Sequence, residues 1–478
     1  MLRTPRNVLR AARTTNVLQR RCGSSWATAV ETAARLVTPA AILKDPLSLV
    51  SHEMSQLANN IGKLIGSGHP TLNRISAYYF ESQGKKIRPL IVLLLSRALS
   101  EIPLEERNRI AIDNFDIPEQ PVYESTKSLT ALFAEQMKDP VGPLSPLRIL
   151  HGISPNVVLD PLTKPHESLP EFDSRRGILP KQRRLAEIVE MIHTASLLHD
   201  DVIDNSDSRR NRPSGNIAFS NKMAVLSGDF LLGRASVSIG RLRNPEVIEL
   251  MSTAIANLVE GEFMQLKNTV LQPNEDTIGE DKVIPQPTGV IDTKIHEYSV
   301  SAPIGDSITH EDNVAAAFEY YTHKTYLKTA ALLSKSCRSA AILSGANDHV
   351  IENSYQFGRN LGLCFQMIDD VLDFTQTSEQ LGKPGMADLK LGLATAPILF
   401  AWKENPALGP LISRKFKEEG DVEIAVDAIA KYRGLEQTTE LAEEYCSKAL
   451  ANLREVLPES DSRSALEFLT NAIVTRTK

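Results

Sequence analysis

The stretch that decides the fold is 193–204, His-Thr-Ala-Ser-Leu-Leu-His-Asp-Asp-Val-Ile-Asp, an apolar helical run that ends in three carboxylates. Asp200 and Asp204 share one face of the predicted helix, one turn apart. Two aspartates so placed repel each other unless a cation lies between them. Mg²⁺ suits such a pair, because it binds through a few carboxylates and completes its shell with water and phosphate oxygens.

Arg209 and Arg210 follow this stretch and offer planar guanidinium groups for phosphate oxygens. Alone, the pattern is equally consistent with a solvated acidic helix end. A second copy at 366–373, Gln-Met-Ile-Asp-Asp-Val-Leu-Asp, favours a functional site, because it again follows an apolar run. We predict that the two helices face each other across a bundle and hold a diphosphate through several Mg²⁺ ions. The predicted metal ligands are Asp200, Asp201, Asp204, Asp369, Asp370 and Asp373.

Composition narrows the class of protein. The chain has 478 residues and 42% hydrophobic residues, which is enough for one large domain or two ordinary ones. Its net charge of −6 argues against bulk nucleic-acid binding. The four cysteines form neither a CxxC pair nor a zinc-ligand spacing, which fits a reduced compartment or inert buried thiols. No apolar run approaches the ~20 residues of a membrane span.

The N-terminal 30 residues contain six arginines and no acidic residue. An arginine-rich, acid-free leader is typical of a mitochondrial transit peptide, and a basic disordered tail is the alternative. We expect residues 1–35 to be this transit peptide and residues 45–478 to form the folded domain.

The folded part is predicted to be all-α, since no strand pattern is clear. Pro46 directly after Asp45 suits a helix start, and Leu47, Val50 and Met54 repeat at helical spacing. Two proline-rich segments, about 104–183 and 268–310, interrupt the helices. Prolines at this density exclude long helices, so both segments are predicted to be irregular insertions.

Several cations could bind a diphosphate beside the acidic motifs. Lys85 and Arg88 stand at a loop-to-helix junction, a plausible anion site, although a lone GKxxR is weak evidence. Lys324 and Thr325 offer a charge and a hydroxyl together; the alternative is a plain basic helix face, because Lys328 lies one turn on. Lys383 follows the second motif in a loop and could reach the same diphosphate. Asp229, Glu262 and Gln265 are interpreted as buried hydrogen-bonding groups between helices.

Seven motifs, taken together and in this order, resemble those of the trans-polyprenyl diphosphate synthases, and they span about residues 45–475. More narrowly, the chain resembles the fungal-type mitochondrial enzymes that make the coenzyme Q side chain. The motifs are GKKIRP (84–89), DDVID with RR (200–210), GDFLLGRA (228–235), GEFMQ (261–265), KTYLKTA (324–330), QMIDDVLDF (366–374) and GKPGMADLKLGLATAP (382–397).

The resemblance implies an isoprenoid-synthase helical bundle around a central cavity, and a role for each motif. The residues expected to bind isopentenyl diphosphate are Lys85, Arg88, His193 and Arg210. Those expected to contact the allylic diphosphate, farnesyl or geranylgeranyl diphosphate, are Arg209, Lys324, Thr325, Gln366 and Lys383. The residues expected to act in catalysis are Asp200, Asp204, Lys324 and Asp369. Both aspartate triads would hold Mg²⁺.

The implied activity is Mg²⁺-dependent, sequential 1′-4 condensation of isopentenyl diphosphate onto the allylic diphosphate. The implied product is a long all-trans chain, with hexaprenyl expected, that supplies the ubiquinone side chain. A homodimer is expected, with a hetero-oligomer as the alternative. The implied location is the mitochondrial matrix, with peripheral association with the inner membrane as a further expectation, and no nucleic-acid partner.

Two small residues bear on product length. Long helical side chains lean toward the N-terminus, so Ala195 and Ser196 are expected to lie beneath the site at Asp200. Short-chain members of the family place an aromatic plug there, and its absence predicts an open tunnel. The alternative is that these residues merely serve helix packing.

Three rival functions remain open. A short-chain farnesyl or geranylgeranyl synthase would differ in product length. A non-catalytic subunit would show no turnover without a partner, although such subunits usually lose acidic triads. A terpene cyclase would not require isopentenyl diphosphate.

Overall fold

The computed structural model describes residues 45–67, 69–80, 86–103, 177–209, 212–267, 309–375 and 386–476. Within these ranges the only strands are β1 (Ser208–Arg209) and β2 (Arg212–Pro213), which pair antiparallel. The predicted all-α fold is confirmed. The predicted transit peptide, 1–35, and most of both predicted insertions lie outside the described residues.

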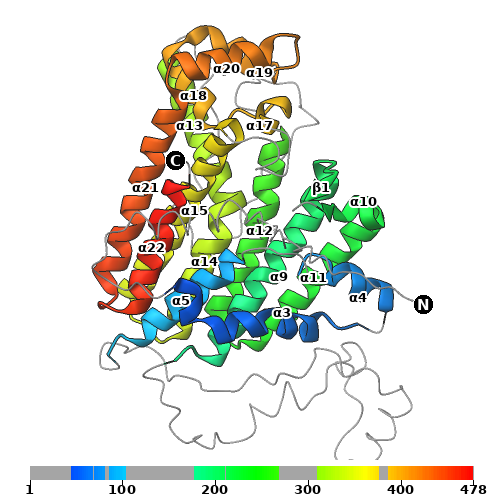
Figure 1. Cartoon of the computed structure of the whole chain (residues 1–478), viewed down its shortest axis with the longest axis vertical. Coiled ribbons are helices and arrows are strands. Elements are labelled where there is room, and N and C mark those ends of the chain that lie inside the picture. Colours follow the sequence, from blue (N-terminus) through cyan, green and yellow to red (C-terminus); the bar gives the residue numbers. More distant parts are fainter. Residues whose placement is uncertain are drawn as a thin grey trace, which may run out of the picture.

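The helices follow one another through the described chain as follows (Figure 1). They are α2 (Pro46–Leu49), α3 (Ser51–Ile65), α4 (Pro70–Ala77), α5 (Ile87–Ser100), α9 (Pro180–Ile203), α10 (Gly215–Phe219), α11 (Asn221–Arg241), α12 (Pro245–Lys267), α13 (His310–Thr325), the π-helical turn η2 (Tyr326–Ala330), α14 (Ala331–Leu343), α15 (Asp348–Thr375), α17 (Ala387–Lys390), α18 (Ala396–Glu404), the 3₁₀ turn η3 (Pro406–Leu408), α19 (Gly409–Ser413), α20 (Asp421–Lys431), α21 (Gly434–Val456) and α22 (Asp461–Thr475).

Local chemistry explains several helix starts. The Asp45 side chain accepts from the Leu47 N–H and caps α2, with Pro46 in its first turn, as predicted. Pro180 likewise begins α9, so the insertion predicted to reach residue 183 ends earlier. Pro180 fits this place because the first helical position needs no N–H donor.

The long helices run side by side and form one bundle (Figure 1). α9 packs against α5, α11 and α14, while α15 packs against α14 and α21. The approach of α15 to α14 is close: a Cβ at Gly358 or Gly362 would come within 2.7 Å of a backbone Cα on the facing segment. Since α9 and α15 carry the two acidic motifs, the bundle places both motifs on helices that share α14 as a neighbour.

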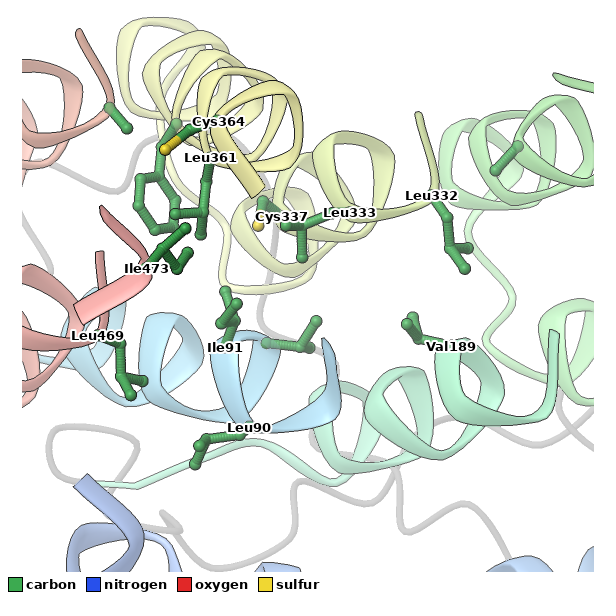
Figure 2. Close-up of a cluster of buried hydrophobic side chains, with 14 of the residues drawn as sticks. Leu90, Ile91, Val189, Leu332, Leu333, Cys337, Leu361, Cys364, Leu469 and Ile473 are labelled. Carbon is green, nitrogen blue, oxygen red and sulfur yellow. The ribbon is translucent and has the colours of Figure 1, made fainter. Parts of the chain in front are cut away.

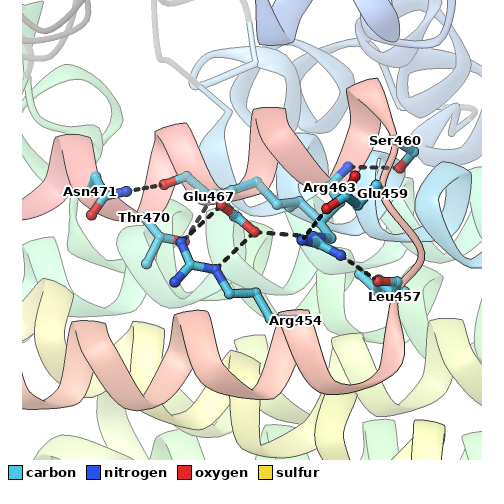
Figure 3. Close-up of polar contacts among 9 residues, drawn as sticks. Arg454, Leu457, Glu459, Ser460, Arg463, Glu467, Thr470 and Asn471 are labelled. Atoms are coloured by element: carbon cyan, nitrogen blue, oxygen red, sulfur yellow. Dashed lines mark hydrogen bonds and ion pairs between the residues drawn. The ribbon is translucent and has the colours of Figure 1, made fainter. Parts of the chain in front are cut away.

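The last helix, α22, is held by apolar packing and by charge. Its Leu469 and Ile473 are buried beside Ile91 of α5 and Leu361 of α15 (Figure 2). On its polar side Glu467 accepts hydrogen bonds from Arg454 of α21 and from Arg463 one turn away (Figure 3). This double attachment fixes the direction in which the end of α22 points.

No helix in the described part of the chain combines the length and the apolar character that crossing a bilayer requires.

Candidate functional site

The first predicted pair of diphosphate-binding residues is brought together by the fold. Arg88, in the first turn of α5, places Nη1 3.0 Å from Nε2 of His193 on α9, although the two are 105 positions apart. Because a guanidinium can only donate, the facing histidine nitrogen accepts. This contact with Arg88 helps to orient the His193 ring.

Asp200 and Asp204 stand at the C-terminal end of α9. Among the described residues, neither carboxylate accepts a hydrogen bond or forms an ion pair. Burial raises the pKa of Asp200 to about 6, and the nearby charge of Lys328 opposes that rise. Burial also raises the pKa of Asp204. The two carboxylates are thus partly desolvated while their oxygens stay available to a cation.

A partly buried ion pair lies next to these aspartates. Nζ of Lys328, in η2, is 2.6 Å from Oε2 of Glu262 on α12. The other oxygen of Glu262 is buried and has no hydrogen-bond partner among the described residues. Glu262 was predicted to be a buried group that links two helices, and the pair does join α12 to η2. The same prediction for Asp229 was wrong, because its side chain is 62% exposed, with Oδ1 3.5 Å from Nε2 of His199. Its effect on the pKa of Asp200 also makes it part of the candidate site.

The middle aspartate of the first motif, Asp201, is fully buried and already engaged. Its Oδ1 accepts from Nε of Arg209 at 2.7 Å, and its Oδ2 accepts from the Tyr79 hydroxyl. The same hydroxyl accepts from the Gly215 N–H at 2.7 Å. Asp201 therefore ties the end of α9 to the segment after α4 and to the start of α10.

The middle aspartate of the second motif is engaged in the same way. Asp370 of α15 accepts from the Tyr321 hydroxyl at 2.7 Å and from the Gln366 amide at 2.9 Å. Thr329 donates to the Gln366 carbonyl at 2.8 Å and so orients this amide. Thr325 forms a hydrogen bond with Tyr321. Burial is the main cause that raises the pKa of Asp370.

The outer aspartates of the second motif have different partners. Asp369 is 40% exposed and forms an ion pair with Arg476, just after α22. The Arg476 guanidinium also lies 4.5 Å from the centre of the Phe365 ring. Asp373 is buried, and its Oδ2 accepts from the Asp388 N–H at 3.1 Å, which attaches α17 to the motif.

Buried charges connect the two motifs. Lys324 is only 9% exposed, so burial lowers its pKa, while the charge of Asp370 opposes this change. The charges of Lys328 and Glu262 also shift the pKa of Lys324, and the same two charges shift the pKa of Asp200. The prediction left open a plain basic helix face, but Lys324 is buried between the motifs. It therefore faces the candidate site and not solvent.

The described residues contain no ready-made cluster of three His, Cys, Asp or Glu side chains able to hold a metal ion. Mg²⁺ does not need one, because it keeps several waters and takes phosphate oxygens from its substrate. The oxygen donors of Asp200 and Asp204, one turn apart and without hydrogen bonds from the described chain, fit such an ion. The residues present are thus compatible with Mg²⁺.

The sequence matches the polyprenyl synthetase family over residues 168–284 and 294–429. This is more than half of the chain. The chain belongs to the polyprenyl synthetase family. Its predicted family membership is confirmed.

Individual polyprenyl synthetases extend the comparison. The chain is 63% identical to hexaprenyl pyrophosphate synthase, mitochondrial, of Saccharomyces cerevisiae, over 97% of both chains. It is 56% identical to the probable hexaprenyl pyrophosphate synthase, mitochondrial, of Yarrowia lipolytica, over 95% of this chain and 89% of that one. A crystal structure of polyprenyl synthase from Caulobacter crescentus, complexed with calcium and isoprenyl diphosphate, superposes with a TM-score of 0.61 at 22% identity. It covers 92% of this chain and 100% of that chain, and shows the shared fold.

Some residues predicted for a polyprenyl synthetase site cannot be placed, and others were not predicted. Lys85, Arg210 and Lys383 lie outside the described residues.

Tyr79, Tyr321 and Arg476 each contact a motif aspartate, yet no sequence pattern pointed to them. A buried carboxylate needs donors, so the sequence implied that such partners exist without saying where in the chain they lie.

The two residues predicted to govern chain length differ in burial. Ala195 is fully buried in the main core, while Ser196 is partly exposed and donates to the His193 carbonyl at 2.9 Å. A cavity of about 400 Å³ in the described chain lies elsewhere, between α3 and the end of α4, and is lined by residues such as Gly62 and Phe80. The predicted tunnel therefore stays a prediction.

Proposed function

We propose that this chain is a mitochondrial long-chain polyprenyl diphosphate synthase. It would add isopentenyl diphosphate repeatedly to farnesyl or geranylgeranyl diphosphate, with a hexaprenyl product for the ubiquinone side chain. The observation that carries this proposal is the set of charged groups shared by the two acidic motifs: buried Lys324 and the partly buried ion pair of Lys328 with Glu262. The identity of 63% to the yeast enzyme across 97% of the chain supports it.

Five of the six motif aspartates divide into two proposed roles, and Asp373 stays a predicted metal ligand. Asp200, Asp204 and Asp369 would hold Mg²⁺, because they are the least buried of the six and reach the site with open or exchangeable oxygens. Asp201 and Asp370 already accept two hydrogen bonds each, so they would position the motifs and the cations beside them. When bound, Mg²⁺ would supply Lewis-acid stabilisation of the departing diphosphate.

The other residues bind and orient the two substrates. Arg88 and His193, together with Lys85 and Arg210, would hold isopentenyl diphosphate beside the first motif. Lys324, Thr325 and Gln366, together with Arg209 and Lys383, would hold the allylic diphosphate. Lys324 supplies a positive charge in a partly water-excluded place, where it stabilises developing negative charge more strongly than in water.

The chemistry requires no side-chain nucleophile. The allylic C–O bond breaks as negative charge builds on the diphosphate, and the double bond of isopentenyl diphosphate attacks the allylic carbon. The resulting cation then transfers a proton to the released diphosphate, which restores a double bond and completes one cycle. The apolar side chains of the bundle exclude water that would otherwise capture the cation.

We also propose a homodimer through α11 and α12. Leu226 of α11 and Val259 and Phe263 of α12 are large, apolar and exposed. A Cβ at Gly233 or Gly240, seven residues apart on α11, would meet no other atom of the described chain within 4 Å. Exposed glycines at this spacing allow a second helix to approach closely. Sedimentation of a Gly233→Arg variant as a monomer would support this face, and an unchanged dimer would exclude it.

Product analysis tests the proposed activity. The purified chain would be incubated with Mg²⁺, isopentenyl diphosphate and an allylic primer, and the products identified by mass spectrometry. A long polyprenyl diphosphate is expected. Only C15 or C20 products would indicate a short-chain synthase, and turnover without isopentenyl diphosphate would indicate a cyclase. No turnover until a partner protein is added would indicate a non-catalytic subunit.

The predicted N-terminal transit peptide needs its own test. We propose that residues 1–35 direct the chain to mitochondria and are removed there, with the mature protein in the matrix or peripheral to the inner membrane. A reporter carrying residues 1–35 should be imported and shortened. A reporter that stays in the cytosol at full length would refute the transit-peptide role of residues 1–35.

A further inference from the structure

Arg476 occupies a position that the proposed function does not explain. It follows directly after α22, and its Nη2 donates to Oδ1 of Asp369. The arginine side chain is 8% exposed, whereas its aspartate partner is 40% exposed. The carboxylate that would receive a metal is thus covered on one side by a cation from the far end of the chain.

The guanidinium is held in place by more than this one contact. It lies over the Phe365 ring, 4.5 Å from the centroid, and Nη2 also reaches the Phe365 carbonyl at 3.4 Å. Its Nε is buried and has no hydrogen-bond partner among the described residues. A buried donor without an acceptor is costly, so Asp369 leaves part of the hydrogen-bonding capacity of the guanidinium unused.

The rest of α22 is anchored independently of Arg476. Leu469 and Ile473 are buried against the bundle, and Glu467 is clamped between Arg454 and Arg463 (Figures 2 and 3). The position of α22 therefore places the guanidinium beside Asp369, and α22 does not need that contact to hold its own position.

We propose that Arg476 is a resident counter-ion of Asp369, which competes with Mg²⁺ for this carboxylate and moves to the diphosphate when the metal–substrate complex binds. This inference rests on the proposed metal role of Asp369. The charges account for the exchange: two cations cannot share one exposed carboxylate without repulsion, and a guanidinium binds phosphate oxygens well. In the free protein the charge of Asp369 is then balanced by Arg476, and Mg²⁺ without diphosphate binds this carboxylate weakly.

The test is Mn²⁺ binding to the full chain without diphosphate, followed by electron paramagnetic resonance of the free ion. Arg476→Gln removes the competing charge and should tighten Mn²⁺ binding by about fivefold, the equivalent of one ion pair of about 1 kcal/mol. Arg476→Lys keeps the charge and should stay near the wild-type affinity. A merely structural arginine would give the opposite sign, because its loss would loosen the site and weaken metal binding.

Two further variants make the result specific. Arg338→Gln breaks an ion pair with Glu352 that touches neither motif, so it should leave Mn²⁺ binding unchanged. In the double variant Arg476→Gln/Asp369→Asn the fivefold gain should disappear. Added inorganic diphosphate should strengthen Mn²⁺ binding more in the wild type than in Arg476→Gln, because only the wild type has a guanidinium to transfer.

The outcomes separate this inference from the proposed function. If Asp369→Asn weakens Mn²⁺ binding but Arg476→Gln leaves it unchanged or weaker, the competition is refuted and the metal role of Asp369 stands. If Asp369→Asn has no effect on Mn²⁺ binding with or without diphosphate, the metal role itself is refuted.

Discussion

Nζ of Lys328 lies 2.6 Å from Oε2 of Glu262. The charge of Lys328 lowers the pKa of the Asp200 carboxyl, and the charge of Glu262 raises it. The lysine side chain is 24% exposed and the glutamate 10%, so solvent screens the pair only in part. The charges that surround the first motif are therefore balanced partly by the chain itself before any metal or substrate arrives. Each member of the pair matters for stability as well as for binding.

A double-mutant cycle measures how strongly this pair is coupled. Lys328→Met leaves a partly buried carboxylate without its cation, and Glu262→Gln leaves the opposite charge. We expect a coupling energy of about 1–2 kcal/mol in the free energy of unfolding, measured by urea denaturation. The matched control is the pair Arg338–Glu352, whose glutamate is 53% exposed and whose coupling should stay below about 1 kcal/mol. Equal coupling in the two cycles would contradict the role of burial.

The raised pKa of Asp200 predicts how stability depends on pH. Its folded pKa of about 6 lies above the value of about 4 expected in the unfolded chain. The folded state therefore binds more protons between these values, and without divalent metal its stability should fall as pH rises from about 4 to 6. Thermal denaturation across this range should show a flatter dependence for Asp200→Asn. Parallel curves for the two proteins would argue against the shift.

Substitutions should separate the metal carboxylates from the positioning ones. We expect Asp200→Ala and Asp369→Ala to keep the fold but to lower turnover by more than about 100-fold, because Lewis-acid stabilisation of the leaving diphosphate is lost. Asp201→Asn weakens the contacts to Tyr79 and Arg209, so it should cost about 10–100-fold in activity and also lower the melting temperature. Circular dichroism and steady-state kinetics give both readouts. Near-normal turnover in both alanine variants would refute the metal assignment.

Much of this site could be predicted from local sequence. The spacing of Asp200 and Asp204 fixes their shared helix face, and the repeat of the pattern at Asp369 implies a second such helix. The helix start at Pro46 followed from the missing N–H of proline. These features depend only on residues close together in the chain, for which the geometry of a helix is sufficient.

The partners of the aspartates could not be predicted, for a physical reason. Tyr79, Tyr321 and Arg476 are 122, 49 and 107 positions from the aspartates that they contact. Nothing in their local sequence distinguishes them from other tyrosines and arginines. Lys324 shows the same limit, because only the packing of α12, α13 and α15 around it determines that its charge is buried.

Product length offers a test of the space beneath the first motif. Ala195 lies five residues before Asp200, about 7.5 Å lower along α9, and its side chain is fully buried. If the growing chain passes this level, Ala195→Phe should block it and shift the products to shorter polyprenyl diphosphates, measured by mass spectrometry. A phenyl ring in a packed core can also cost about 1–3 kcal/mol, so the melting temperature must be followed. Ser196→Phe is the companion variant, because Ser196 is partly exposed and tolerates a larger side chain. Ala195→Ser, nearly equal in volume, should leave both stability and product length unchanged. A folded, active Ala195→Phe enzyme with wild-type products would show that the chain grows along another path.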